Sequence, residues 1–205
     1  MIKNNHFNHV DRFRDAFIAA CITLVLEAYS ESLKVQSIKN NWKENDITLK
    51  LNDHFDSCAT KYLRQISTNV EDYQIVDDQT FRGYSYKTNR IDLRFVCWSS
   101  NVEHKYYMEA KRITEKDSDL KRRYITDGID SYLTNKYKAG FLAGYLVEGS
   151  EEKAVEGINN LLKKDKRLKE CLRKKQFPQC NTYYESYHNH NRLIRHIILD
   201  FTNCK

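Results

Sequence analysis

Three charged residues on two neighbouring predicted strands, Asp92, Glu109 and Lys111, are of the types that hydrolytic sites use. Asp92 lies in the segment RIDLRF, whereas Glu109 and Lys111 lie in the segment YYMEAKRI. Because side chains alternate between the two faces of a strand, Glu109 and Lys111 share a face, and Asp92 is expected to point the same way. Two carboxylates and the backbone carbonyl of Ala110 could bind a hard divalent cation such as Mg²⁺. With Lys111 to orient a water molecule, this set predicts metal-dependent phosphodiester hydrolysis.

The pattern of an acid, any residue and a lysine is common, and the chain contains it three times. The matches are Glu103-His104-Lys105, Glu109-Ala110-Lys111 and Glu151-Glu152-Lys153. The first is expected in a polar loop, and the third opens a helix, where acids favour the positive end of the dipole. Only the second is expected inside a covered strand, where two carboxylates are costly without a cation. The alternative is a structural ion-pair network of Asp92 and Glu109 with Lys111 and Arg94.

The elements that must position these residues follow from the periodicity of the apolar side chains. We expect helices at about residues 11–34, 44–63, 118–137 and 151–163, and strands at about 73–76, 90–98, 105–113, 139–147 and 193–201, with a turn around Gly83. The run AGFLAGYLV at 139–147 is typical of a central strand covered on both faces. Gly128, Gly140 and Gly144 are expected to permit close packing of a helix on this strand. The order of elements predicts a mixed α/β sandwich.

Composition sets broader limits on the protein. The 205 residues predict a single domain over 1–205, with an N-terminal helical extension (1–40), a core (44–147) and a C-terminal helix and strand (148–205). The net charge of +6 permits a phosphate-rich partner without requiring one. Six scattered cysteines without a CxxC pair or a secretory signal predict a reduced, cytoplasmic protein. The uncharged stretch 16–26 is shorter than the roughly 20 residues of a membrane span, so no membrane partner is expected.

The segments RIDLRF and YYMEAKRI, followed by a helix and an apolar strand, resemble the PD-(D/E)XK, or restriction-endonuclease-like, nuclease superfamily. The resemblance covers about residues 44–147. It implies a restriction-endonuclease-like three-layer sandwich with a central mixed β-sheet, and an endonuclease that uses Mg²⁺ or Mn²⁺ to hydrolyse DNA in restriction or antiviral defence. Two features depart from the family: Ile91 replaces a proline before Asp92, and the long helix lacks Gln-x-x-x-Tyr. The second departure argues against a processive enzyme like lambda exonuclease.

The resemblance also implies a fourth site residue. Members often carry a further acid on the helix that precedes the three strands, and Glu44 in ENDIT occupies that place. Glu27 is a weaker candidate because it precedes the core by a whole helix. The expected catalytic set is therefore Asp92, Glu109, Lys111 and Glu44, and the expected metal ligands are Asp92, Glu109, Glu44 and the carbonyl of Ala110.

Basic residues of the long helix are candidates for DNA contact. Lys121, Arg122 and Arg123 could hold the phosphate backbone beside the metal, and Lys136 and Lys138 follow at its far end. A solvated helix face is the competing interpretation. The basic run at 163–175 has the same two interpretations: a track along a duplex, or a solvated helix.

Partners beyond DNA are expected from two arguments. The first helix is apolar over much of its circumference, which predicts burial in a core or in a homodimer whose two sites would cut two strands. The resemblance adds other subunits of a defence system. The competing function is a catalytically inactive nuclease fold acting as an interaction or DNA-binding module, and RNA or branched DNA are alternative substrates of the same site.

The C-terminal region offers weaker signals. Its candidate metal ligands, Cys171, Cys180, His188, His190, His196 and Cys204, match the spacing of no familiar zinc module. We expect His196 to pair within a strand, and His188 and His190 to lie in a polar loop. Tyr183, Tyr184 and Tyr187 could stack on bases, but clustering means little in a chain with 14 tyrosines.

Overall fold

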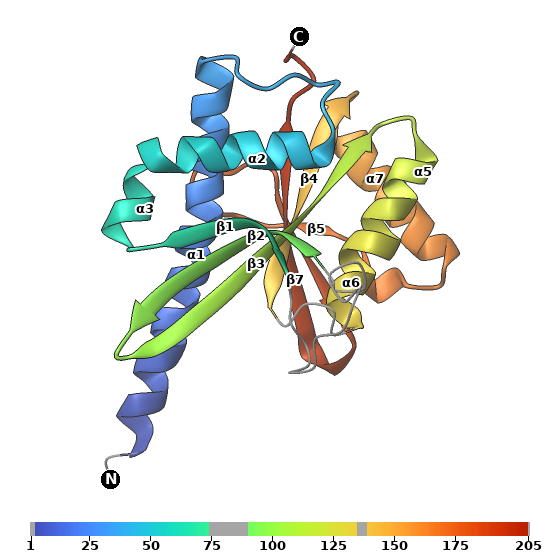
Figure 1. Ribbon diagram of the computed structural model, residues 1–205. Helices are drawn as coiled ribbons and strands as arrows, with labels where there is room; N and C mark the ends of the chain where they lie inside the picture. The colour runs from blue at the N-terminus through green and yellow to red at the C-terminus, as the bar shows by residue number, and fades with distance from the viewer. Residues whose placement is uncertain (1–2, 74–89, 135–138, 205) are drawn as a thin grey trace, which may run out of the picture.

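A single mixed sheet organises the part of the chain that the structure describes, which is residues 3–73, 90–134 and 139–204 of a computed structural model. Its strand order is β1-β2-β3-β4-β7-β6-β5 (Figure 1). The β3–β4 and β4–β7 pairs are parallel, and the other pairs are antiparallel. The strands are β1 (Ser67–Tyr73), β2 (Arg90–Ser99), β3 (Val102–Thr114), β4 (Gly140–Glu148), β5 (Arg173–Lys174), β6 (Tyr183–His188) and β7 (Arg192–Asp200).

Helices cover both faces of this sheet, which confirms the predicted mixed α/β class (Figure 1). One face packs against α1 (Lys3–Lys34) and α2 (Glu44–His54), and the other against α5 (Ser118–Arg123), α6 (Asp130–Leu133) and α7 (Glu151–Lys164). Side chains of β4 alternate between the two cores: Phe141 and Tyr145 enter the first, and Leu142 and Leu146 the second. The expectation that this apolar strand is covered on both sides is therefore confirmed.

Helix α1 belongs to the first core. Its segment Arg12–Lys34 is apolar and long enough to cross a membrane, the one such helix in the described part of the chain. Cys21, Ile22, Leu24 and Val25 of that segment are fully buried against the sheet, and this burial accounts for its composition. The helix is thus an integral layer of the fold, and its apolar character no longer argues for a dimer interface.

Two predicted elements of the first half have different bounds in the structure. The helix expected at 44–63 is interrupted: α2 ends at His54, a 3-10 turn follows at Phe55–Ser57, and α3 spans Ala59–Leu63. The 3-10 turn carries the buried Phe55, and the extended backbone of Cys58 then redirects the chain. The strand expected at 73–76 overlaps β1 (Ser67–Tyr73) only at Tyr73, so most of β1 was not predicted. The remainder of that prediction and the turn around Gly83 lie outside the described residues.

The loop predicted between β2 and β3 is a two-residue turn. Ser100 and Asn101 have φ of 50° and 63°, the left-handed pair that suits a tight hairpin. Glu103 and Lys105 consequently lie within β3, where their side chains form a surface ion pair of 2.6 Å. The prediction that this acid-x-Lys match sits in a loop was wrong, although its side chains remain solvent-exposed.

The second half contains three features that periodicity did not indicate. The long helix is divided by a π-helical turn at Tyr124–Ile129. The basic run 163–175 ends α7, forms a 3-10 turn (Leu168–Glu170) and enters β5. Strand β6 carries Tyr183 and Tyr184, both buried, so these two side chains are not available to stack on bases.

Glycines permit the close approach of α5–α6 to β4, as expected from the sequence. A Cβ added at Gly140 would collide with the backbone oxygen of Tyr107 and lie 2.7 Å from Cε1 of Tyr132. At Gly144 it would lie 3.3 Å from Cε2 of Tyr124 in the helix and 2.7 Å from Cδ1 of Ile198 in the neighbouring strand β7, and at Gly128 it would lie 2.9 Å from Cδ2 of Leu142. These contacts leave no room for a methyl group.

The substitution Gly140→Ala should lower the free energy of unfolding by about 1–3 kcal/mol, because a backbone atom cannot yield to the added carbon. Chemical denaturation of purified protein measures this change. Gly157→Ala in α7 is the comparison variant, since the nearest atoms there belong to the Lys121 side chain and not to the backbone. It should cost less than Gly140→Ala, because a side chain can shift where a backbone oxygen cannot and the alanine gains up to about 1 kcal/mol of helix propensity. Equal stability of both variants would contradict the packing argument.

Candidate active site

The predicted site residues lie where β2 and β3 separate. Pairing between the two strands ends at Leu93 and Met108. On the N-terminal side of Leu93, β2 continues to pair with β1 as far as Arg90. On the C-terminal side of Met108, β3 continues to pair with β4. The two strands therefore diverge into a fork, formed by residues 90–92 of β2 and 109–112 of β3. Backbone groups on the β2-facing edge of β3 lose their strand partner in this fork and need other ones.

Carboxylates from two elements supply those partners. Oδ2 of Asp92 accepts a hydrogen bond from the backbone N–H of Ala110 (2.7 Å), and Oε2 of Glu44 accepts one from the N–H of Arg112 (2.9 Å). Glu44 reaches the fork from the first turn of α2, where a negative charge also suits the helix dipole. The backbone of β3 thus fixes two carboxylates from different parts of the chain.

The ammonium group of Lys111 lies among the oxygens of the fork. Its Nζ is 2.6 Å from Oε1 of Glu109, 2.8 Å from the carbonyl oxygen of Ala110 and 3.7 Å from Oε1 of Glu44. Glu109 and Lys111 are each only 5% exposed. The structure therefore brings together all four predicted catalytic residues, with Glu109 and Lys111 on one face of β3 as the alternation requires.

Negative charge exceeds positive charge in this cluster. Burial, followed by repulsion from Glu109, raises the pKa of Asp92 to about 7. Burial alone would lower the pKa of Lys111, but Glu109, Asp92 and Glu44 outweigh it and raise that pKa above its ordinary value. The second oxygen of Glu109, Oε2, is buried without a hydrogen-bond partner. Inside the fork one ammonium faces three carboxylates, and from the rim Arg123 reaches only Glu44, so the fork is suited to further positive charge.

A hard divalent cation fits the donor types of the fork. Carboxylate and carbonyl oxygens are its preferred ligands, and the unpartnered oxygen of Glu109 offers one directly. In the described residues, no group of three or more His, Cys, Asp or Glu side chains is already arranged to hold a metal ion. At the fork, the Lys111 ammonium contacts both Glu109 (2.6 Å) and Glu44 (3.7 Å). Ligation would therefore require this side chain to leave Glu109.

The three basic residues proposed for DNA contact have different environments. Arg123 is half exposed, and its Nη2 lies 3.4 Å from Oε1 of Glu44, which places a cation at the rim of the fork. Arg122 pairs with Asp165 at the end of α7. Lys121 is buried and donates to the carbonyl groups of residues 114 and 115. We therefore withdraw Lys121 as a phosphate contact; Lys136 and Lys138 lie outside the described residues.

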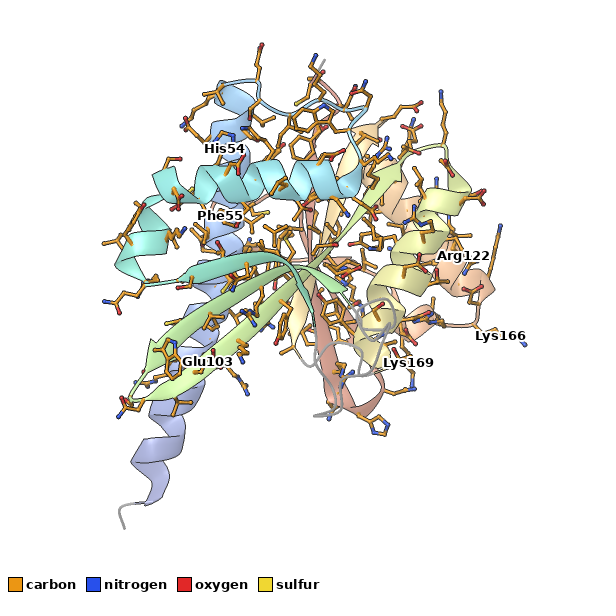
Figure 2. The ribbon with its side chains drawn as sticks, in the orientation of Figure 1. His54, Phe55, Glu103, Arg122, Lys166 and Lys169 are labelled. Atoms are coloured by element: carbon orange, nitrogen blue, oxygen red, sulfur yellow. The ribbon has the colours of Figure 1, made fainter. Side chains whose placement is uncertain are left out.

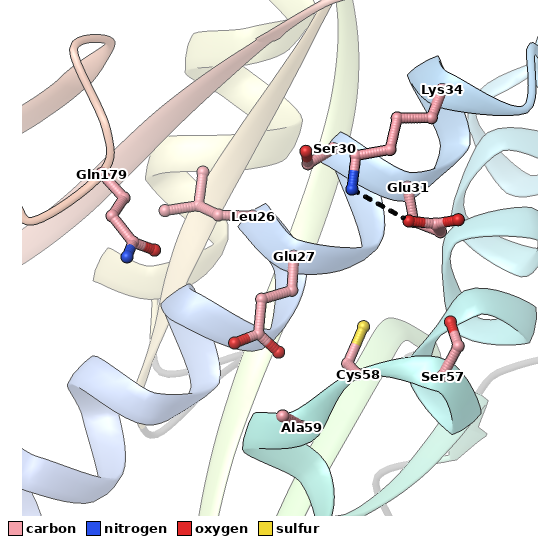
Figure 3. Close-up of a pocket in the computed structure, with 9 residues that line it drawn as sticks. All are labelled: Leu26, Glu27, Ser30, Glu31, Lys34, Ser57, Cys58, Ala59 and Gln179. Carbon is pink, nitrogen blue, oxygen red and sulfur yellow. Dashed lines mark hydrogen bonds and ion pairs between the residues drawn. The ribbon is translucent and has the colours of Figure 1, made fainter.

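Glu27 lies away from the fork. Its carboxylate accepts hydrogen bonds from the backbone N–H (3.2 Å) and the hydroxyl (2.6 Å) of Thr60, which stabilises the start of α3. It lines a separate pocket of about 320 Å³ between α1 and α3, with Glu31, Cys58 and Gln179 (Figure 3). Its role in the structure is helix capping.

One positioning residue was missed by the sequence analysis. The hydroxyl of Tyr132 accepts from the backbone N–H of Glu109 (3.2 Å) and donates to the carbonyl of Phe141 (2.8 Å), so it bridges β3 and β4 beside the fork. Tyr132 falls on the same helical stripe as Tyr124 and Gly128, which predicted burial but gave no sign of the hydrogen bonds.

The C-terminal histidines belong to a buried hydrogen-bonded chain. Tyr124 Oη lies 3.0 Å from His196 Nδ1, and Ser186 Oγ lies 2.7 Å from both His196 Nε2 and His188 Nε2. His188 Nδ1 is 2.7 Å from the carboxylate of Glu170. The six cysteines are free thiols, and the zinc ligands considered from the sequence do not converge among the described residues. His196 lies in β7 as expected, whereas His188 ends β6 and is buried.

The carboxylate of Glu170, at one end of this hydrogen-bonded series of side chains, determines which atom of each pair carries the proton. Burial opposes ionisation of Glu170, but hydrogen bonds from Arg167 and His188 outweigh it and keep its pKa below the ordinary value. His188 must therefore donate from Nδ1. Burial lowers the pKa of both histidines, that of His196 to about 3, so both are neutral. It follows that Ser186 donates to His188, His196 donates to Ser186, and Tyr124 donates to His196.

Comparison with known protein families, with characterised proteins and with solved structures finds no match. Any functional conclusion about this chain consequently rests on the fork and its surroundings.

The substitution Asp92→Asn should stabilise the protein in the absence of divalent metal. Because the folded-state pKa is raised, ionising Asp92 destabilises the fold as pH rises from about 4 to about 7. Asparagine keeps an acceptor for Ala110 and removes the charge, so the free energy of unfolding should rise by about 1–3 kcal/mol above pH 7. The gain should vanish near pH 3. Denaturation in EDTA across this range, with exposed Asp53→Asn as control, measures it; a loss of stability at pH 8 would contradict the charge imbalance.

The substitution Ser186→Ala should destabilise the fold, because it leaves the ring nitrogens of His188 and His196 without a partner. The expected loss is about 1–3 kcal/mol for each buried group left unsatisfied. Ser131→Ala, at a buried hydroxyl that only supplements a helix carbonyl, is the control and should cost less than about 1 kcal/mol. Thermal unfolding compares the stabilities of the two variants. An unchanged stability of the Ser186→Ala protein would argue against the hydrogen-bonded series of side chains.

Proposed function

We propose that this protein is a Mg²⁺- or Mn²⁺-dependent nuclease that hydrolyses DNA phosphodiester bonds at the β2–β3 fork. The observation that carries the proposal is the convergence of Glu44, Asp92, Glu109 and the Ala110 carbonyl around the ammonium of Lys111. A buried cluster with this excess of negative charge costs stability in a protein that has no cation to place there. A carboxyl group whose pKa is as strongly raised as that of Asp92 is typical of functional sites.

The arrangement of elements supports a restriction-endonuclease-like fold as the finer description. Helix α2 precedes the antiparallel strands β1, β2 and β3, and the helix α5–α6 then leads to β4, which is parallel to β3. This is the order that the resemblance implies for the nuclease core. The acids lie on β2, β3 and α2, in the places expected from it.

Each residue of the fork has a distinct part in the proposed reaction. Glu44, Asp92, Glu109 and the carbonyl of Ala110 would hold the cation. A bound divalent cation supplies positive charge against the phosphate and lowers the pKa of water. Lys111, once released from Glu109, can donate from Nζ to the attacking water or to a phosphate oxygen.

Arg123 has the position of a substrate-binding residue. Its guanidinium lies at the rim of the fork beside Glu44 and is half exposed. A phosphate adjacent to the cleaved bond could accept hydrogen bonds from it there. The residue would then hold the strand in register with the carboxylates.

A second function is favoured by one observation. The buried contact of 2.6 Å between Lys111 and Glu109 is a complete ion pair, which a catalytically inactive nuclease fold could retain for structure alone. In such an interaction or DNA-binding module the two residues would act only on stability. Metal binding distinguishes this function from the enzyme.

Calorimetry with Mn²⁺ and incubation with supercoiled, linear, single-stranded and branched DNA test the nuclease. Glu109→Gln should abolish both metal binding and cleavage. Lys111→Ala should retain metal binding, because it removes a competing cation, but lower the cleavage rate about 100-fold or more. Glu103→Gln and Lys105→Ala are matched controls, since this pair has the same spacing on the exposed part of β3. Both control variants should cleave as the unmodified protein does.

Two results would contradict the proposal. The absence of metal binding by the unmodified protein at millimolar Mn²⁺ would favour the inactive module. Cleavage undiminished in Lys111→Ala would remove this residue from the mechanism while leaving the metal site in place.

The cellular setting is proposed from the resemblance and from general requirements. We place the enzyme in the cytoplasm, in restriction or another defence against foreign DNA, where other subunits could join it. With α1 buried in the core, the remaining argument for a homodimer is that cutting two strands at one place needs two sites. Sedimentation at equilibrium decides this point: a mass of 24.4 kDa would exclude the dimer.

A further inference from the structure

A basic surface adjoins the fork along the end of α7. Residues 163–175 include eight lysines and arginines and two acids, Asp165 and Glu170. Both acids are engaged elsewhere: Asp165 pairs with Arg122, and Glu170 binds Arg167 and His188. The acids of the segment therefore do not neutralise its lysines.

Four lysines form the outer part of this surface, which we call the α7 basic surface: Lys163, Lys164, Lys166 and Lys169. All four are exposed, and none forms an ion pair with a described residue. Figure 2 shows Arg122, Lys166 and Lys169 on the same side of the molecule. Lysines within seven consecutive residues and without a counter-charge repel one another, so a polyanion bound there would relieve the repulsion.

The α7 basic surface is joined to the fork through adjacent residues of α5. Both terminal nitrogens of Arg122 bind the carboxylate of Asp165, which immediately follows α7. The next residue of α5, Arg123, reaches Glu44 at the rim of the fork. A backbone of phosphates could therefore pass from the fork over α5 to the lysines.

The chemistry of the surface distinguishes a duplex from a single strand. Sites for single strands combine cations with aromatic side chains on which bases stack. Residues 163–176 contain no aromatic residue, and their one strongly exposed apolar side chain is Leu168. Lysines alone suit the backbone of a duplex, which carries one negative charge per roughly 1.7 Å of its axis.

We propose that Lys163, Lys164, Lys166 and Lys169 bind the phosphate backbone of a nucleic acid duplex whose cleaved bond lies at the β2–β3 fork. The position of the cut rests on the proposed nuclease function, whereas binding to the surface does not. The protein thus acts on double-stranded substrate, and the lysines set affinity without reading sequence.

Fluorescence anisotropy in EDTA measures this binding separately from cleavage. The probes are a DNA duplex of about 30 base pairs and its single strand, titrated with the full chain between roughly 50 and 200 mM salt. In the variant Lys163/Lys164/Lys166/Lys169→Gln, Kd for the duplex should rise at least about tenfold. The slope of log K against log salt should become shallower by about 3.6, since each of the four lost phosphate contacts contributes roughly 0.9.

A matched variant controls for net charge. Lys34/Lys39/Lys50/Lys105→Gln removes the same charge from α1, α2, the segment between them and β3, and should leave the slope nearly unchanged. Circular dichroism and thermal unfolding establish that both variants are folded. Equal loss of affinity in the two variants would overturn the proposal, as would tighter binding of the single strand than of the duplex. Equal affinity for an RNA duplex would support it, because the contacts are to the backbone.

Cleavage kinetics separate failure of this proposal from failure of the nuclease. In Mn²⁺ the variant of the basic surface should raise KM at least about tenfold with kcat retained, whereas Lys111→Ala lowers kcat. If the unmodified protein cleaves DNA and the four-lysine variant binds the duplex with undiminished affinity, only the proposed role of the α7 basic surface is overturned. Lysine-dependent duplex binding without metal binding or cleavage would support the surface and overturn the enzyme.

Discussion

The end of strand pairing at Leu93 and Met108 is the constraint on which the site depends. Were β2 and β3 paired further, the N–H of Ala110 would bond to backbone, and the Asp92 carboxylate would have no such anchor. Divergence leaves the edge of β3 to be satisfied by side chains, and buried backbone groups rarely go without partners. The carboxylates that could take part in catalysis thus also satisfy the backbone N–H groups of β3. This ties the shape of the site to the stability of the strands.

Packing of the helix against β4 also constrains Glu109, a residue of the fork. Gly140 lets α5–α6 approach β4 so closely that the hydroxyl of Tyr132 enters the space between β3 and β4. That hydroxyl holds the backbone of Glu109 from one side, while Lys111 holds its carboxylate from the other. When Lys111 leaves, the hydrogen bond to Tyr132 still fixes the backbone of Glu109, and a fixed backbone position is a general requirement of preorganised sites.

The predictable parts of the structure are those determined by local periodicity. Alternation along β3 placed Glu109 and Lys111 on one face, and the apolar run of β4 indicated burial on both sides. The rest depends on partners distant in sequence. Strand β6 looked polar because its buried Ser186 and His188 bind each other, and Lys121 looked exposed because the carbonyls that hold it come from the end of β3. The extended conformation of Cys58, which ends the predicted helix early, and the end of β2–β3 pairing at Leu93 and Met108 have no signal in the local sequence pattern.

The place of α1 in the first core has a consequence for biosynthesis. The hydroxyl of Tyr29 bonds to the backbone of Asp200, 171 positions later, and its ring packs on Phe201. The helix leaves the ribosome before these partners, which emerge only with β7. The part of its apolar face that packs on Phe201, in a helix long enough to pass for a membrane segment, thus stays uncovered until then. The nascent chain in that interval is a natural client for chaperones, since exposed apolar surface of this kind drives aggregation.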